Sequence, residues 1–392
     1  MDQRYIQESK EGGEQGESKL YHRPCSVFPD DILRLIFSRL DWVDRIHMRT
    51  VCKDWRRLMN EIPYQLQGKL PWLLTYGTRE MEYLSLCKLT DPVSRKTYSV
   101  KVSNKRRKRF LYAISCASKF GWVLFSRRVP NHGCRRHSLW WFSAYCPFNN
   151  KIIKLPRWYG DSHDGATFSI DPTSPDCIFF IFKIKDDRSM KALISICRIG
   201  DKKWRKLKFP VPGEFKNAIY PWQNWEVAYV NGGFYTVSAT GLVGVFDVKL
   251  QEWKLLTSSS QFGNAHRCYP IVSQEQLFMV GNVQLDSSWM VWRFDTVQKQ
   301  WVEEEKCNWK NRVIFLGCTT FIAEAVGELS THASIYKCYI PNYSSSLSSE
   351  FYFNHSLYGK VISKPIFGRT WIQPPMFLDH KKDNTSASSI ED

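Results

Sequence analysis

The sequence predicts a small all-α N-terminal module of three helices, followed by an all-β propeller of six blades that a C-terminal strand closes. Three observations predict this fold class: the hydrophobic period changes near residue 70, a unit recurs about every 50 residues, and aromatic residues are abundant. The 392 residues include 16 Trp, 18 Tyr and 24 Phe. Large rings in that quantity suit the flat packing layers between β-sheets.

The helical pattern lies within residues 27–58. Five apolar residues recur there at helical spacing on one broad stripe: Ile32, Leu33, Ile36, Phe37 and Leu40. Pro29, followed by two aspartates, suits the first turn of a helix, because carboxylates favour the positive helix end. Three short helices in about 40 residues cannot bury all their apolar faces on one another, so part of that surface needs a partner.

From Leu70 onward the period changes to two, and short apolar runs alternate with turn residues, which predicts β-strands. One unit recurs, in which a strand and a polar turn precede an aromatic or aliphatic anchor. The anchors are Tyr98, Ile153, Trp204, Trp253, Trp301 and Phe351. A period of about 50 residues matches a four-stranded propeller blade of the kelch size, so we expect six blades.

The first unit lacks its first strand, because residues 71–74 align with the second strand of the next unit at 121–124. A spare segment, residues 369–373, follows the sixth unit. We expect this C-terminal strand to complete the first blade and close the ring, which leaves no long open sheet edge.

Composition excludes other classes of protein. Hydrophobic residues make up 43% and charged residues 24% of the chain, as in a folded globular protein. The longest apolar runs are far shorter than the roughly 20 residues that span a bilayer, so we expect no membrane contact. The 12 cysteines form no CxxC pair, and the N-terminus shows no secretion signal. We therefore expect a location in the nucleus and/or the cytoplasm.

Residues 27–58 resemble an F-box, the module that docks a substrate receptor onto SCF-type ubiquitin ligases. The resemblance is carried by Phe28-Pro29-Asp30-Asp31-Ile32-Leu33, Ile36, Leu40 and Val51-Cys52-Lys53-Asp54-Trp55-Arg56. Phe28 replaces the usual leucine. Together with the degenerate propeller and the C-terminal Trp-Ile-Gln-Pro, the chain resembles the large plant family of F-box proteins with kelch-like propellers.

This resemblance implies a non-catalytic receptor whose F-box binds a Skp-type adaptor, and through it a cullin, while the propeller binds a protein for ubiquitination. The adaptor-binding residues are then Phe28, Pro29, Ile32, Leu33, Ile36, Phe37, Leu40, Val51, Cys52 and Trp55. The expected segments are a disordered leader at 1–22, the F-box at 23–64, the propeller at 65–378 and a disordered tail at 379–392. A helix-turn-helix DNA-binding module and a plain cap on the propeller remain alternatives for the helical segment.

The formal net charge of +17 lies almost wholly in the predicted propeller. Because strands alternate in direction, loops between second and third strands share a face with the connections between blades. Basic residues in and beside these loops form a candidate site for an acidic or phosphorylated protein substrate: Arg107, Arg127, Arg128, Arg135, Arg136, Lys185 and Arg188. A solvated basic rim is the alternative, and the run at 105–109 also fits a nuclear import signal.

No catalytic motif is present among HExxH, GxSxG, GxxxxGK and GxGxxG. His132, Cys134 and His137 lie beside two arginines and lack a fourth ligand, so we expect neither a metal nor another cofactor. Two other functions stay open. One is a basic propeller that binds RNA, DNA or another acidic partner without a ubiquitin role. The other is a propeller enzyme or lectin, which would need an acidic central pocket.

Overall fold

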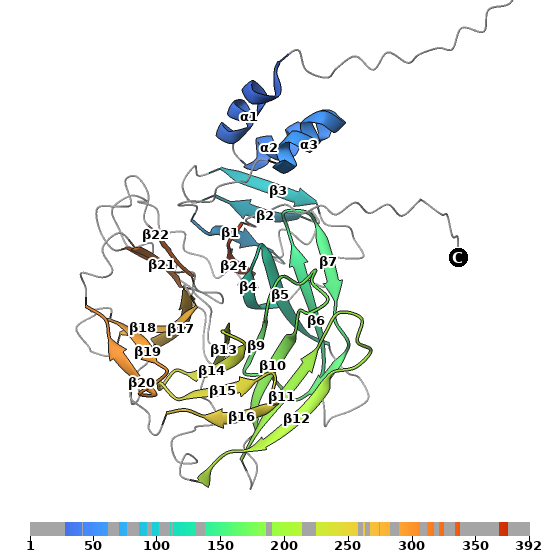
Figure 1. The fold of residues 1–392 in the computed structure, drawn as a ribbon. Coiled ribbons are helices and arrows are strands. Elements are labelled where there is room, and N and C mark those ends of the chain that lie inside the picture. The colour runs from blue at the N-terminus through green and yellow to red at the C-terminus, as the bar shows by residue number, and fades with distance from the viewer. Residues whose placement is uncertain are drawn as a thin grey trace, which may run out of the picture. The chain divides into compact units, whose positions relative to one another are not determined.

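Figure 1 shows a computed structural model of the chain, which divides into two compact units. One comprises Met1–Gln65 with Phe377–Asp392 and contains the helices, so we call it the helical unit. The other, the β unit, comprises Leu66–Met376. The structure describes residues 28–40, 42–61, 70–76, 86–91, 96–101, 110, 113–129, 138–185, 190–213, 225–257, 262, 267–273, 275–282, 290–305, 312–316, 321–324, 334–337 and 368–374.

The helical unit contains α1 (Asp30–Arg39), α2 (Trp42–Val51) and α3 (Lys53–Glu61). A single residue, Cys52, separates α2 from α3. Leu33 and Phe37 of α1 pack against Leu58 and Met59 of α3, and all four side chains are buried. This cluster gives the unit a hydrophobic core of its own. No helix among the described residues is long and apolar enough to cross a membrane.

The β unit contains five antiparallel sheets that we call blades 1 to 5, in chain order. Blade 1 consists of β24 (Arg369–Ile372), β1 (Trp72–Thr75), β2 (Leu86–Thr90) and β3 (Thr97–Lys101). Blade 2 consists of β4 (Ile114–Lys119), β5 (Trp122–Val129), β6 (Ser138–Cys146) and β7 (Lys151–Lys154), with β8 (Trp158–Gly160) also paired to β6.

The next three blades are regular four-stranded meanders. Blade 3 consists of β9 (Gly165–Phe168), β10 (Phe179–Lys185), β11 (Lys191–Cys197) and β12 (Arg205–Pro210). Blade 4 consists of β13 (Trp225–Val230), β14 (Gly233–Ser238), β15 (Val243–Asp247) and β16 (Glu252–Leu255). Blade 5 consists of β17 (Arg267–Ser273), β18 (Gln276–Asn282), β19 (Met290–Asp295) and β20 (Gln300–Glu303).

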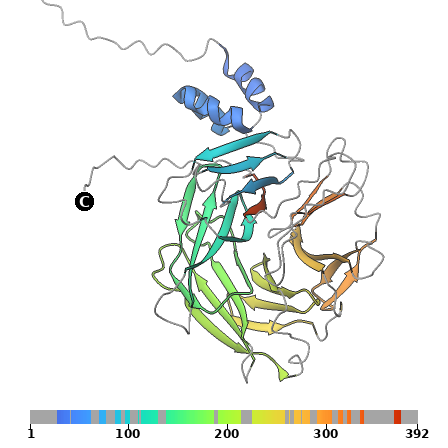
Figure 2. The ribbon, with the colours of Figure 1, turned by 180° about the vertical axis from the view of Figure 1, so that it is seen from behind.

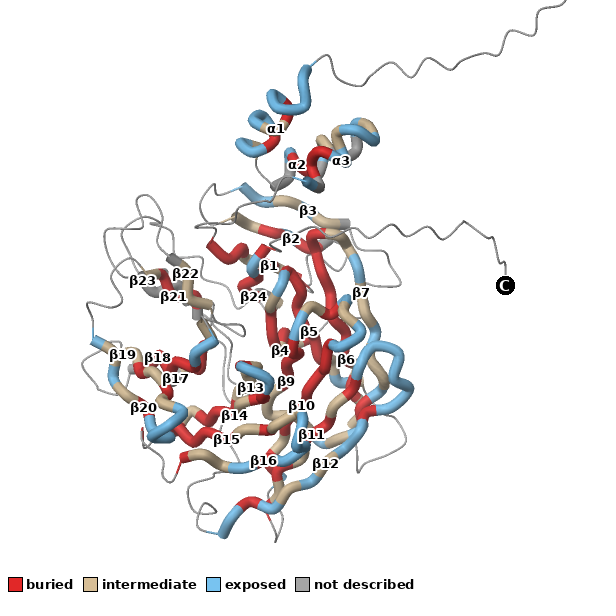
Figure 3. Tube along the Cα trace, in the orientation of Figure 1, coloured by how far each residue is buried: buried red, intermediate tan, exposed pale blue. Residues whose placement is uncertain are grey.

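The blades are arranged around a centre, with β24, β4, β9, β13 and β17 as their innermost strands (Figures 1 and 2). Neighbouring sheets contact one another through these strands and β22 (Phe321–Glu324), in the order β24, β4, β9, β13, β17 and β22. Buried residues concentrate on the inner and middle strands, whereas the outer strands β12 and β16 are mostly exposed or partly exposed (Figure 3). The predicted β-propeller is therefore confirmed as the architecture of this unit.

The sixth sheet differs from the expected blade. It has three described strands in the order β22, β21 (Arg312–Leu316) and β23 (Ser334–Lys337). In a blade each strand pairs antiparallel with the next, but β23 pairs parallel to β21. The prediction of six blades is therefore wrong for the part of the chain that the structure describes, where five sheets have the blade order. The anchor Phe351 lies outside the described residues.

The predicted C-terminal strand completes blade 1. β24 pairs antiparallel with β1, and Trp371 lies opposite Leu73. The Trp371 side chain is 2% exposed, and its ring meets Phe315 of β21 edge-on with 4.9 Å between the ring centroids. β24 thus joins the first blade to the sixth sheet and closes the circle of sheets.

The recurring anchors mark the outermost strands. Trp204 directly precedes β12, while Trp253 and Trp301 lie on β16 and β20. Each of the three indoles is buried. The Trp204 indole N–H donates to Pro156 O (2.8 Å) and that of Trp301 donates to Gly241 O (2.8 Å), so both reach the preceding blade. The period of about 50 residues reflects this repeated contact between blades.

Gly368, which leads into β24, has a left-handed backbone with φ +92°. A Cβ atom at this position would lie 1.8 Å from the carbonyl oxygen of Tyr76, whose own N–H donates to Gly368 O. Gly368→Ala should therefore destabilise the β unit by about 3 kcal/mol or more, through backbone strain plus overpacking. Gly200→Ala is the control, because Gly200 has φ +88° but open space around it. It should cost about 1–2 kcal/mol. Equal losses in thermal unfolding would contradict the closure that β24 provides.

Glu226 on β13 is partly buried, and no described residue donates a hydrogen bond to its carboxyl. Desolvation raises its pKa from 4.5 to about 8. The unfolded chain loses this proton first, so stability should fall as the pH rises from about 4.5 through about 8. Glu226→Gln should then raise the free energy of unfolding by at least about 1 kcal/mol at pH 8 and change little at pH 4. Glu252→Gln on exposed β16 is the control; an equal gain there would contradict the role of burial.

Candidate functional site

Helix α1 carries two apolar stripes on different sides. Leu33 and Phe37 face α3 and are 2% and 1% exposed. The second stripe follows the helical spacing one position earlier, with Ile32 and Ile36 at i and i+4. Because the first stripe already fills the core of the unit, the second is left on the surface.

The second stripe is broadly exposed. Phe28, Ile32, Leu35 and Ile36 are 57%, 45%, 52% and 41% exposed, and Val51 at the end of α2 is 56% exposed. We call these five residues the apolar surface of the helical unit. Exposed large aliphatic and aromatic side chains such as these are typical of a surface that another protein covers.

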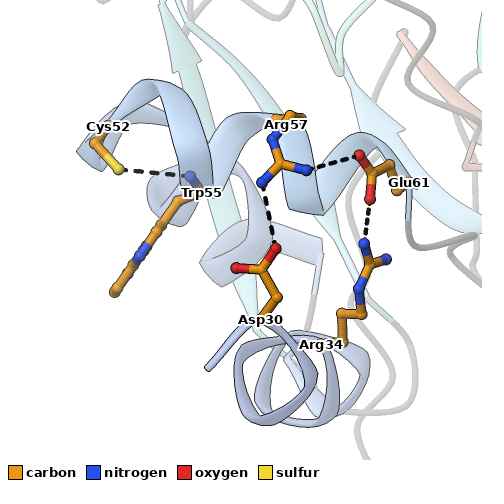
Figure 4. A network of polar contacts seen from close by, with 6 residues as sticks. All are labelled: Asp30, Arg34, Cys52, Trp55, Arg57 and Glu61. Carbon is orange, nitrogen blue, oxygen red and sulfur yellow. Dashed lines mark hydrogen bonds and ion pairs between the residues drawn. The ribbon is translucent and has the colours of Figure 1, made fainter. Parts of the chain in front are cut away.

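Ion pairs hold α1 against α3 beside the core (Figure 4). The Arg57 guanidinium contacts Asp30 at 3.3 Å and Glu61 at 3.2 Å, and Arg34 also pairs with Glu61. The Arg34 hydrogen bond, more than Arg57, lowers the pKa of the Glu61 carboxyl. The Arg57–Asp30 and Arg34–Glu61 pairs join α1 to α3, whereas Arg57–Glu61 lies within α3. Because all of these side chains are solvent-exposed, the pairs add little to stability.

Cys52 is the residue between α2 and α3. Its thiol accepts a hydrogen bond from the Trp55 backbone N–H (3.5 Å), and its carbonyl accepts one from the Arg56 N–H (3.1 Å). The thiol thus serves as an N-terminal cap for α3. Trp55 packs edge-on against Phe37, with ring centroids 5.3 Å apart. This contact connects the third helix to the core.

The structure separates the ten predicted adaptor-binding residues by exposure. Phe28, Pro29, Ile32, Ile36 and Val51 are exposed; Leu40, Cys52 and Trp55 are partly buried; Leu33 and Phe37 are buried. The two buried residues therefore support the surface from beneath. Sequence reasoning missed Leu35, although its position three residues after Ile32 places it on the same stripe.

Of the seven predicted substrate-binding residues in the β unit, the structure describes three. Arg127 and Arg128 lie at the end of β5, and Lys185 ends β10. Arg107, Arg135, Arg136 and Arg188 lie outside the described residues. β5 and β10 are the second strands of blades 2 and 3, so their ends lie at the same side of the propeller.

The three described cations have defined neighbours. The Arg127 guanidinium lies 5.8 Å from the centroid of the Trp141 ring, its cross-strand partner. The Arg128 Nε donates to the hydroxyl of Ser138 (2.9 Å). Lys185 is exposed and lies directly opposite Lys191 on β11. Like charges in this position repel one another.

Within the described part of the chain, no group of three or more His, Cys, Asp or Glu side chains is arranged to hold a metal ion. His132, Cys134 and His137 lie outside it. The partly buried His163 is enclosed by aromatic rings, and its Nε2 lies 2.9 Å from Ser126 Oγ. Burial, with a smaller effect from Lys183, lowers its pKa to about 4. This imidazole is therefore a neutral packing residue at ordinary pH.

Comparison with known proteins agrees with both units. Residues 25–64 match the F-box domain, and residues 85–338 match the KIB1-4 β-propeller. The apolar surface and its supporting core lie within the first match, and Arg127, Arg128 and Lys185 lie within the second.

Three relatives from Arabidopsis thaliana are named as F-box or F-box/kelch-repeat proteins. The F-box protein At4g00893 is 24% identical over 70% of this chain and 62% of its own length. The F-box protein At1g49360 is 28% identical over 71% and 54%, and the F-box/kelch-repeat protein At1g57790 is 25% identical over 58% and 57%. The chain spans less than two thirds of the length of these relatives. Because the propeller match covers more than half of the chain, this protein belongs to the KIB1-4 β-propeller family and carries an F-box domain ahead of its propeller.

Proposed function

We propose that the chain is the substrate-recognition subunit of an SCF-type ubiquitin ligase. In this proposal the F-box binds a Skp-type adaptor, and through it a cullin, while the propeller binds the protein to be ubiquitinated. The F-box spans 23–64 and the propeller 65–378, with 1–22 and 379–392 outside both. The subunit acts in the nucleus or the cytoplasm and has no catalytic group of its own, since holding a substrate near the conjugating enzyme raises its effective concentration.

The apolar surface of the helical unit is the observation that carries this proposal. The unit already has a closed core in Leu33, Phe37, Leu58 and Met59, so its exposed side chains are not needed for its own packing. Burial of one such side chain contributes about 1.5–3 kcal/mol. A few of them suffice as the anchors of a helical docking interface.

The basic side of the propeller, where Arg127, Arg128 and Lys185 lie at the ends of β5 and β10, supports the proposal that the propeller binds a protein substrate. These are the second strands of two neighbouring blades. A phosphorylated or acidic protein segment offers the oxygen acceptors that guanidinium and ammonium groups bind.

Ile32→Asp and Ile36→Asp should each weaken binding of the full chain to a purified Skp-type adaptor by about tenfold or more, because each places a charge in the interface. Isothermal titration calorimetry gives the dissociation constants. Val297→Asp is the matched control, since it also replaces an exposed aliphatic side chain with a carboxylate, but in the turn between β19 and β20 of the β unit. Unchanged affinity in both isoleucine variants, or no adaptor binding by the unmodified chain, would contradict the proposal.

Charge reversal by Arg127→Glu with Arg128→Glu should abolish capture of the protein substrate. The measurement is quantitative mass spectrometry of proteins retained by the receptor in cells whose proteasome is inhibited. Lys249→Glu with Lys299→Glu is the control, because these exposed cations lie in turns between third and fourth strands, at the other side of the propeller. If both double variants retained the same amount of substrate protein, the basic side would be excluded as the substrate site. Enrichment of nucleic acid alone, lost steeply with salt, would favour the RNA- or DNA-binding alternative.

A further inference from the structure

The outer strand of blade 3 carries an unusual concentration of positive charge. Five exposed cations, which we call the basic edge, lie within seven residues on β12 and the turn before it: Lys202, Lys203, Arg205, Lys206 and Lys208. The outer strands of blades 4 and 5 differ, because β16 and β20 have four residues each and include Glu252 and Glu303. β12 has six residues and no acidic residue.

The charge of the basic edge is not neutralised by its neighbours. Among the described residues, none of the five cations forms an ion pair. The nearby Asp201 carboxylate accepts the backbone N–H of Arg198 (2.8 Å) and so closes the turn. Burial, and then the charge of Lys208, lowers the pKa of the Lys206 ammonium, so these two cations repel one another.

The backbone of β12 is open on one side. In the described sheet β12 pairs with β11 alone, in the order β12-β11-β10-β9. The Val211 N–H donates to Met190 O (3.1 Å), and antiparallel pairs exchange hydrogen bonds at every second residue. Given the register Phe209↔Ala192 and Leu207↔Ile194, the backbone N–H and C=O groups of Phe209 and Leu207 form hydrogen bonds with β11. The N–H and C=O groups of Lys206 and Lys208 therefore point to the open edge.

The side chains around this edge are firmly placed. Leu207 and Phe209 pack against the hydrophobic core between blades 3 and 4. On the other face, the Lys206 ammonium donates to Tyr159 O (2.7 Å) and lies 5.7 Å from the centroid of the Trp158 ring. Because side chains on both faces of β12 fix its position, the open edge is already in the extended conformation that another strand would pair with.

We propose that the open edge of β12 binds an extended acidic polypeptide segment, which adds to blade 3 as a further strand. Its backbone pairs with Lys206 and Lys208, and its carboxylates lie beside the basic edge. Lysines on an edge strand also discourage aggregation. However, β16 and β20 are likewise the outer strands of their sheets, and neither carries a run of five cations. A nucleic acid fits less well, because its phosphates accept hydrogen bonds and give none to the outward carbonyl groups.

This site goes beyond the proposed function and is tested separately from it. The probe is a fluorescent, end-blocked eight-residue peptide of alternating glutamate and valine, titrated with the full chain and followed by fluorescence anisotropy. The same peptide with glutamine in place of glutamate should bind at least about tenfold more weakly. Lys208→Ala should weaken binding of the acidic peptide about two- to fivefold, as expected for one exposed charge pair. Lys254→Ala on β16 is the control and should leave binding unchanged.

The backbone contribution is tested in two ways. Lys208→Pro removes an outward N–H and leaves the inward bonds to β11 intact, so it should bind about two- to tenfold more weakly than Lys208→Ala. A glutamate–valine peptide that is N-methylated at every residue keeps its charge but has no N–H donor on either edge, and it should bind the unmodified chain at least about tenfold more weakly. Equal binding of methylated and unmethylated peptides would overturn strand addition.

A twelve-residue oligothymidine that bound as tightly as the acidic peptide, with the same loss of affinity in Lys208→Ala, would assign the edge to nucleic acid instead. Adaptor affinity, measured on the same variants, should not change.

Discussion

The β unit depends on one noncovalent closure, the pairing of β24 with β1. Blade 1 has only three strands from its own part of the chain, so its inner edge stays open until a segment about 300 residues later arrives. Loop-closure entropy rises slowly with loop length, so such a distant pairing is possible. Gly368 permits the close approach to Tyr76, and Trp371 connects the strand to Phe315 of the sixth sheet.

Closure has a direct consequence for the charged surfaces. In a closed ring the ends of second strands lie on one side, and the outer strands form the rim. The ends of β5 and β10, which carry Arg127 and Lys185, thereby lie on the same side although they belong to different blades. β12 remains as a sheet edge whose backbone is half unpaired. The helical unit, by contrast, has its own core. Its apolar surface can therefore serve a partner without disturbing the propeller.

Local patterns explain which features the sequence could predict. The strand period and the tryptophan anchors follow from residues that recur in each blade, and the helices follow from a continuous apolar stripe. Parallel pairing of β21 with β23 joins segments through a connection with no local signal, so the sixth sheet was not predictable from its repeat. The sequence also could not predict which apolar residues of α1 are exposed, because Ile32 and Leu33 are both aliphatic. Which of them faces the core depends on Leu58 and Met59, which lie on another helix.

We propose that the ligase adaptor binds the exposed stripe of α1 together with Val51. Amide hydrogen exchange of the full chain, measured with and without a saturating Skp-type adaptor, tests this most directly. We expect slower exchange in residues 28–36 and around Val51, with unchanged exchange in β24 and β12. Adaptor binding that slowed exchange in the blades and left α1 unchanged would rule out this binding site.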